Sequence, residues 1–163
     1  MKKLLSLFLL SALFLSLSVS SSAQKNDLNG KWKLDRTKSP RQGEWPLLIG
    51  LSVSIKGDSL YADRLYELTD GQQYPFSEAL TLDNKEVNIY VYDMPRKIKA
   101  TWSAPESVLK FESTTTFYSN SGQENFISTE TWKADAANKT LTINYISKTS
   151  AGEVPGIMVF IKE

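Results

Sequence analysis

The sequence predicts an all-β fold, an antiparallel up-and-down β-barrel of about eight to ten strands that follows an N-terminal signal peptide. Apolar and polar residues alternate with a period of two in many short segments, which is typical of strands with one buried face. Compact turn signals separate these segments, and no stretch of 11 or more residues keeps an apolar period of 3.6. Closing the meander into a barrel would remove both exposed edges, and an open sandwich is the alternative.

The first 23 residues have the pattern of a secretory signal peptide. Lys2 and Lys3 precede the apolar run 4–17, and small residues then lead to Ala23. Serines interrupt the run, which is shorter than the roughly 20 apolar residues of a membrane span. We therefore expect residues 1–23 to be cleaved after about Ala23, and residues 24–163 to form one secreted or periplasmic domain without a stable membrane anchor.

Composition excludes several kinds of chemistry. The chain has no His and no Cys, so histidine bases, thiolate nucleophiles, disulfides and zinc-cysteine sites are all ruled out. Without Lys2 and Lys3 the formal charge changes from +1 to −1, which gives nucleic acid no basic surface to bind. We expect no cofactor, no metal site and no nucleic-acid partner.

The strand segments follow one another at short intervals. Their inward residues are, in order, Trp32 and Leu34; Leu51, Val53 and Ile55; Phe76, Leu80 and Leu82; Val87, Ile89 and Val91; Ile98, Ala100 and Trp102; Leu109 and Phe111; Phe126 and Trp132; Leu141, Ile143 and Tyr145; and Ile157, Val159 and Ile161. Turn signals lie at 56–59, 69–71, 83–85, 119–122, 135–138 and 150–152. Short turns imply antiparallel hairpins.

One connection, 36–50, has no clear strand pattern and contains Pro40 and Pro46. Loops of this length in a small domain often line or cover a binding site. Trp45 and the apolar residues 47–49 fit either a lid or a simple cap on one end of the barrel, and the sequence leaves both open.

Strand parity places several polar side chains on the inner faces. They are Glu78, Ser113, Thr115, Ser128 and Glu130. A carboxylate in an apolar interior is costly unless it is protonated, paired or hydrated. The two glutamates therefore indicate a solvated lumen or a pairing with Arg64, unless a β-bulge turns them back to solvent.

A mixed inner face favours a ligand site over a solidly packed core. The candidate ligand-binding residues are Glu78, Trp102, Ser113, Thr115, Glu130, Tyr145 and Trp45. An enzyme that uses the two glutamates as acid and base is a weaker alternative, because no nucleophile or phosphate-loop motif accompanies them.

Residues 28–35 read Leu-Asn-Gly-Lys-Trp-Lys-Leu-Asp and precede Lys38 and Ser39. With Trp132, the string Lys-Thr-Leu-Thr-Ile at 139–143 and Val-Phe-Ile-Lys at 159–162, this opening resembles small secreted bacterial members of the lipocalin-like (calycin-type) β-barrel family. The resemblance covers about 28–163. It implies that Gly30, Trp32 and Trp132 are structural motif residues, with Trp32 packed across a closed end.

Two features depart from the family pattern. Lipocalins place an arginine near the last strand against the first tryptophan, whereas here only Lys148 or Lys162 is available for that role. The second motif, Thr-Asp-x-x-Tyr, is not matched, because Tyr74 lies one residue too far from Thr69 and Asp70.

The resemblance implies a monomeric extracytoplasmic protein that binds a small, largely hydrophobic or amphipathic ligand in the barrel lumen. The alternative is a secreted protein-interaction module with a solid core, which binds a protein partner through exposed tyrosines and the 36–50 loop. The tyrosines expected on that surface are Tyr61, Tyr66, Tyr90 and Tyr92.

Overall fold

The computed structural model describes residues 24–41, 45–119 and 122–163, and it confirms the all-β prediction with ten antiparallel strands in a nearly closed barrel. The expected signal peptide, 1–23, lies outside the described residues. The strands are β1 (Gly30–Leu34), β2 (Leu47–Lys56), β3 (Ser59–Glu67), β4 (Gln73–Thr81), β5 (Val87–Val91), β6 (Met94–Ser103), β7 (Val108–Ser119), β8 (Gly122–Asp135), β9 (Thr140–Thr149) and β10 (Gly152–Lys162). None of the described helical residues forms a helix long and apolar enough to cross a membrane.

The strands form one sheet in the order β4-β3-β2-β1-β10-β9-β8-β7-β6-β5. The first and last strands therefore pair, and the seam lies between β4 and β5 rather than at the ends of the domain. At one end of the seam the Tyr92 hydroxyl donates a hydrogen bond to the Pro75 carbonyl oxygen. At the other end Asp83 and Thr101 form an isolated bridge. These contacts hold together a barrel that the sheet itself leaves open along one line.

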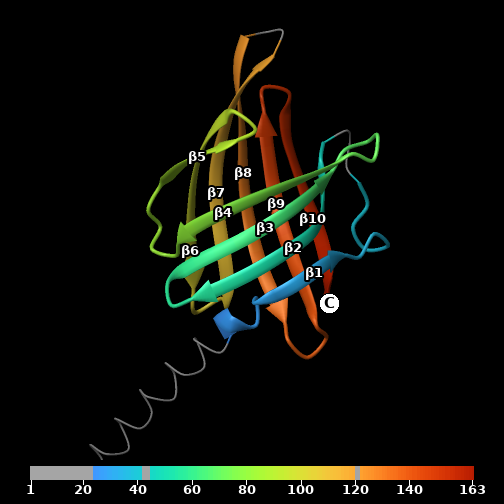
Figure 1. The fold of residues 1–163 in the computed structure, drawn as a ribbon, viewed down its shortest axis with the longest axis vertical. Helices are drawn as coiled ribbons and strands as arrows, with labels where there is room; N and C mark the ends of the chain where they lie inside the picture. Colours follow the sequence, from blue (N-terminus) through green and yellow to red (C-terminus); the bar gives the residue numbers. More distant parts are fainter. Residues whose placement is uncertain (1–23, 42–44, 120–121) are drawn as a thin grey trace, which may run out of the picture.

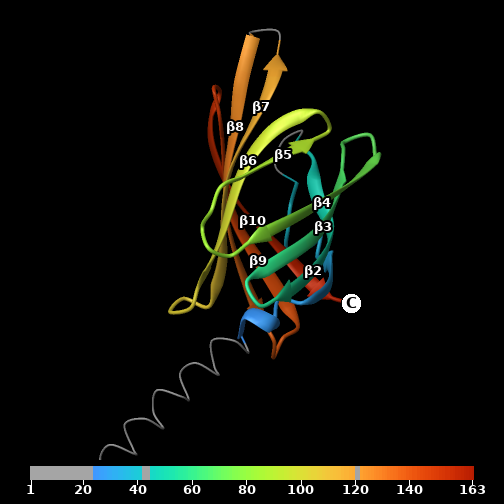
Figure 2. The ribbon, with the colours of Figure 1, turned by 60° about the vertical axis from the view of Figure 1, so that its left-hand side comes forward.

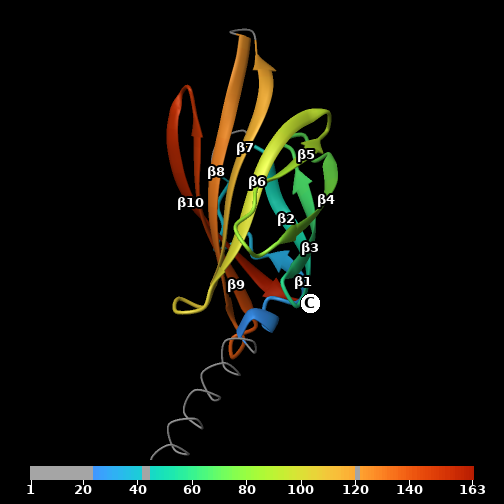
Figure 3. The ribbon, with the colours of Figure 1, turned by 90° about the vertical axis from the view of Figure 1, so that its left-hand side faces the viewer.

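The strands form two walls around the interior. β1 to β4 cross in front of β7 to β10 in Figure 1, and Figure 3 shows the two groups from the side. In Figure 2, β5 and β6 lie beside β7 and curve toward β4, which completes the wall at the seam. The β7–β8 hairpin projects beyond the other strands. We call this end of the barrel the hairpin end.

The opposite end is the closed end, and the apolar core fills it. Because each strand alternates inward and outward residues, one hydrophobic set from nearly every strand meets there. Trp32, Leu109, Trp132, Leu141 and Phe160 are all buried in this core. Trp32 was expected to be a core residue, and its indole Nε1 donates a hydrogen bond to the Leu28 carbonyl oxygen at 2.8 Å.

The predicted lysine against Trp32 is Lys162. Its Nζ lies 5.0 Å from the centroid of the indole ring, at a separation typical of a cation–π contact. Gly30 makes room for it, because a Cβ there would lie 2.7 Å from Lys162 Cε, and the φ of Gly30 is +132°. The glycine and the tryptophan of the Gly-x-Trp segment thus share one partner at the closed end.

The 36–50 segment differs in part from its expected form. Its last residues belong to β2, which begins at Leu47, and a β-bulge lies between Leu48 and Gly50. Leu48 is buried in the core, whereas Trp45 is 49% exposed at the hairpin end. The bulge interrupts the alternation of inward and outward residues at the end of this segment.

Candidate ligand site on the inner face of the barrel

The inner face changes from apolar to polar along β7 and β8. Leu109 pairs with Trp132 at the closed end, and Phe111 pairs with Glu130 in the next layer. Ser113 and Ser128 are opposite each other in the third layer, and both are buried. The parity predicted from the sequence is therefore correct in both strands, and no bulge returns Glu130 to solvent.

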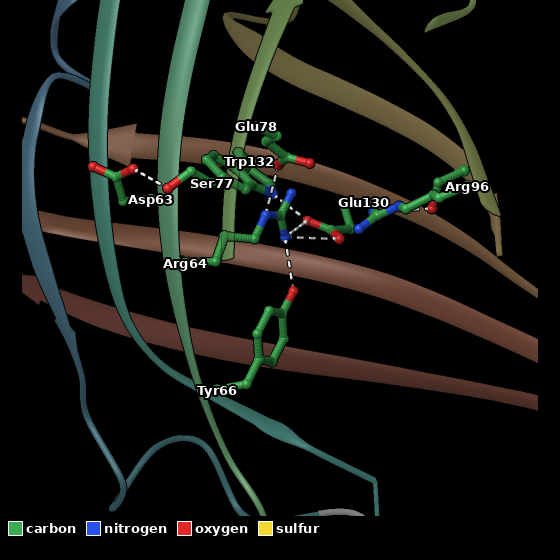
Figure 4. A network of polar contacts seen from close by, with 9 residues as sticks. Asp63, Arg64, Tyr66, Ser77, Glu78, Arg96, Glu130 and Trp132 are labelled. Atoms are coloured by element: carbon green, nitrogen blue, oxygen red, sulfur yellow. Dashed lines mark hydrogen bonds and ion pairs between the residues drawn. The ribbon is translucent and has the colours of Figure 1, made fainter. Parts of the chain in front are cut away.

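Arg64 on β3 lies at the centre of a buried ionic network (Figure 4). Its Nε donates to Glu78 Oε1 at 2.7 Å, and its Nη1 donates to both oxygens of Glu130 at 3.1 and 3.0 Å. A third contact joins Nη1 to the Tyr66 hydroxyl at 3.4 Å. The sequence left open whether the two inward glutamates are hydrated, paired with Arg64 or turned outward by a bulge. In the structure both are paired with Arg64.

Aromatic rings surround this guanidinium. Arg64 Cζ lies 4.9 Å from the ring centroid of Trp132 and 5.4 Å from that of Phe111. The Trp132 indole Nε1 in turn donates to Glu130 Oε2 at 2.7 Å. A flat guanidinium suits both stacking on rings and hydrogen bonding in its plane, which a lysine ammonium would not combine. Trp132 thus contacts both charges of the pair.

The neighbouring charges determine the protonation states of Arg64 and Glu130. Burial disfavours the charged form of Arg64, but the charges of Glu130 and Glu78 outweigh it, and its pKa is well above the ordinary value. Burial also opposes ionisation of Glu130. The charges of Arg64 and Arg96 and the hydrogen bond from Trp132 prevail, so the pKa of Glu130 is below its ordinary value. Both partners are charged at neutral pH.

Arg96 is the second buried arginine, and it comes from β6 on the other side of the network. Its Nη2 donates to the Ser113 hydroxyl at 3.2 Å, and its Cζ lies 5.8 Å from the ring centroid of Phe76. Within the described part of the chain no carboxylate lies within ion-pair distance of Arg96. Arg96 nevertheless lies near enough to Glu130 for its charge to lower the pKa of that carboxyl.

Three buried polar atoms of the network have no hydrogen-bond partner among the described residues: Arg64 Nη2, Glu78 Oε2 and Arg96 Nε. An unsatisfied buried group costs about 1–3 kcal/mol, and more when it is charged. Two of these atoms are donors and one is an acceptor. All three belong to charged side chains on the inner face of the barrel.

The other predicted site residues are distributed along the barrel. Thr115 is half-buried between Arg96 and Phe126, one layer nearer the hairpin end than Ser113 and Ser128. Trp45 reaches the same layer, where its ring lies 5.1 Å from that of Phe126. The half-buried Tyr145 neighbours Glu130, and its ring covers Gly156, where a Cβ would overlap it.

Trp102 is placed differently from its companions. It pairs with Leu109 and packs against the core at the closed end. It lies six positions along β6 from Arg96, which is roughly 20 Å on an extended strand. By strand register, Trp102 lies one layer nearer the closed end than Glu130 and Tyr145. Ser113 and Thr115 lie further toward the hairpin end, where Trp45 packs on Phe126, and Glu78 is joined to Glu130 through Arg64.

Sequence reasoning missed Arg96 and the inward position of Tyr66. The alternation of Ile98, Ala100 and Trp102 continues back to Arg96, so parity would have placed that arginine inward. Tyr66 was expected among the exposed tyrosines and this was wrong, because it is half-buried and packs against the core beside Arg64. Burial raises the pKa of its phenol.

Two surface hollows accompany this interior site. One of about 700 Å³ lies at the closed end near Pro105 and Lys133. The other, of about 490 Å³, is lined mainly by outward residues of β5 to β8, together with Arg96. Neither lining includes Arg64, Glu78 or Glu130. In the described ranges there is no group of three or more acidic side chains that could hold a metal ion.

Comparisons with known proteins do not assign this chain to a family. No model of a known protein family matches the sequence, and no curated protein matches it either.

Proposed function

We propose that this protein is an extracytoplasmic, lipocalin-like binder of a small, largely hydrophobic or amphipathic molecule, which it holds inside the barrel. The observation that carries the proposal is the set of unpartnered polar atoms on Arg64, Glu78 and Arg96, all on one buried inner face. A barrel whose only task were to be stable would gain by filling these positions with apolar side chains.

The surroundings of the three atoms suit an amphipathic ligand. Phe76, Phe126 and Trp45 line the hairpin end with aromatic surface, and Ser113 and Thr115 add hydroxyl groups. Apolar walls with a few placed polar groups are typical of small-molecule sites. The contact of Gly30 and Trp32 with one cation at the closed end supports the resemblance to lipocalin-like barrels, although Lys162 stands where that family has an arginine. The resemblance implies a ligand inside the barrel lumen.

Binding of Nile red, an uncharged lipophilic dye, tests the proposal. The variant Ser128→Trp places a large side chain on the inner face, whereas Thr129→Trp places the same side chain on the outside of the same strand. We expect the first variant to abolish dye binding and the second to retain it. Equal binding by both variants, or a wild type that binds no dye and carries no retained molecule in native mass spectrometry, would refute a luminal site.

The rival function is a secreted protein-interaction module. Its support is exposed aromatic surface on the outside of the barrel, at Tyr61, Tyr90 and Tyr92, to which the structure adds Tyr118 at 82% exposure. Tyr92 also donates to the Pro75 carbonyl, so it has a structural task at the seam. Retention of a protein partner by wild type and by Ser128→Trp alike, together with the absence of dye binding, would favour this function.

A further inference from the structure

The buried charges inside the barrel cancel one another. Among the described residues, the buried charged side chains are Arg64, Arg96, Glu78 and Glu130, which are two cations and two anions. The guanidinium of Arg64 donates hydrogen bonds to both glutamates, and Arg96 lies close enough to Glu130 to lower its pKa. An anionic or cationic ligand would therefore add one uncompensated charge to an interior where charges are poorly solvated.

The pairing of Arg64 with Glu78 is only half complete. A guanidinium and a carboxylate commonly form two parallel hydrogen bonds. Here Nε donates to Oε1 at 2.7 Å, while Nη2 and Oε2 are buried without partners. The unused atoms are one donor and one acceptor. A single hydroxyl oxygen can accept from the first and donate to the second.

We infer that the ligand is an uncharged amphipathic molecule with a hydroxyl head group, which bridges Arg64 Nη2 and Glu78 Oε2 while its apolar part extends toward Phe126 and Trp45. This inference rests on the proposed function and specifies the chemical class of its ligand. The free Nε of Arg96 supplies a further donor for a second ligand oxygen, such as a carbonyl. The balance of buried charges disfavours a fatty-acid anion at this site.

Three ligands of equal chain length test the inference on the wild-type protein. They are dodecanol, dodecyl methyl ether, which accepts but does not donate a hydrogen bond, and dodecanoate, which is anionic at pH 7.5. We expect dodecanol to displace Nile red at least about tenfold more effectively than either of the others, because only its head group satisfies both buried atoms without adding charge.

The variant Glu78→Gln should shift the preference of the site from the alcohol toward the carboxylate. It gives the interior a charge of +1 and replaces the free acceptor with an amide donor, so a carboxylate can accept from both Gln and Arg64. We expect dodecanoate to bind this variant more tightly than it binds wild type, and dodecanol more weakly. Glu112→Gln is the matched control, because Glu112 lies on the outer face of β7 and pairs with Lys99.

The outcomes separate the two proposals. Equal displacement by dodecanol and its methyl ether, or dodecanoate binding to wild type as tightly as dodecanol, would overturn the hydroxyl inference and leave luminal binding intact. Failure of Nile red to bind, together with no retained molecule in native mass spectrometry, would overturn luminal binding. The wild-type ligand series decides the matter even if Glu78→Gln does not fold.

Discussion

Arg64 on β3 and Glu130 on β8 are joined across the barrel interior, with Nη1 of the arginine 3.0 Å from Oε2 of the glutamate. The two strands are not neighbours in the sheet, and 66 residues separate the partners along the chain. The pair thus connects opposite walls that share no ladder of backbone hydrogen bonds. It also fixes the two sides of the proposed ligand site relative to each other.

Removing the cation from this network should be severe. We expect Arg64→Met to lower the free energy of unfolding by about 3–5 kcal/mol, because it leaves two buried carboxylates without their counter-charge. Urea unfolding at pH 7 measures the loss. Arg36→Met is the control, since Arg36 pairs with Glu67 at the surface with 56% of its side chain exposed, and should cost less than about 1 kcal/mol.

A second variant separates the ion pair from the loss of packing. Adding Glu78→Gln and Glu130→Gln to Arg64→Met removes the uncompensated charges, and should restore a substantial part of the lost stability. If the triple variant were no more stable than Arg64→Met, buried charge would not be the cause of the loss.

The pH dependence of stability follows from Glu130. Its pKa in the folded protein is below the ordinary value of 4.5, so the folded state favours the ionised form. The resulting stabilisation is fully present above about pH 4.5, and it is lost as the pH falls through the lower folded pKa. We expect wild type to lose more stability between pH 6 and pH 3 than Glu130→Gln does, as measured by urea unfolding at each pH. Parallel curves for the two proteins would contradict this, and Glu112→Gln should follow the wild-type curve.

Tyr145 and Gly156 should be energetically coupled. A Cβ at Gly156 would overlap the Tyr145 ring, so Gly156→Ala should displace the ring and destabilise the protein by about 1–3 kcal/mol. Tyr145→Ala removes the clash, and the double variant should therefore cost less than the sum of the single variants. Gly50→Ala is the control, because its nearest side-chain atom is at an ordinary 3.5 Å. Additive costs at 145 and 156 would show that the ring does not rest on the glycine.

Trp45 should affect ligand exchange more than stability. Its ring is half-exposed and packs on Phe126 at the hairpin end. We expect Trp45→Ala to change the free energy of unfolding by less than about 1 kcal/mol, as is usual for exposed positions. Release of Nile red from the variant, measured by stopped flow, should nevertheless be faster than release from wild type. The reason is that less aromatic surface covers the hairpin end of the barrel. An unchanged release rate would assign Trp45 to a cap without a role in binding.

Much of the fold was predictable because alternation is a local property. The inward faces of β7 and β8 follow from counting by two, and so do the buried positions of Glu78 and Glu130. Closure was predictable only in general terms. The seam between β4 and β5 depends on the pairing of β1 with β10, which no local pattern specifies.

The site was predicted in part, for a related reason. Arg64 interrupts the apolar alternation of its strand, which signalled that it needed a partner, but the partners lie on β4 and β8. Arg96 carried the same parity signal and was overlooked because it lies at the start of a strand, next to Pro95. Trp102 has the correct inward parity, yet parity does not indicate which end of a strand faces the core and which faces the ligand.

The most direct test of a ligand on this inner face is to follow the side-chain Nε–H resonances of Arg64 and Arg96 by proton–nitrogen NMR during a titration with dodecanol, with Arg96→Gln providing the assignment. Both groups are buried, so their Nε–H protons are protected from rapid exchange with water. We expect the Arg96 resonance, whose Nε has no partner among the described residues, to shift saturably at one equivalent of ligand together with that of Arg64. Shifts confined to residues on the outer face, with both arginine resonances unmoved, would contradict it.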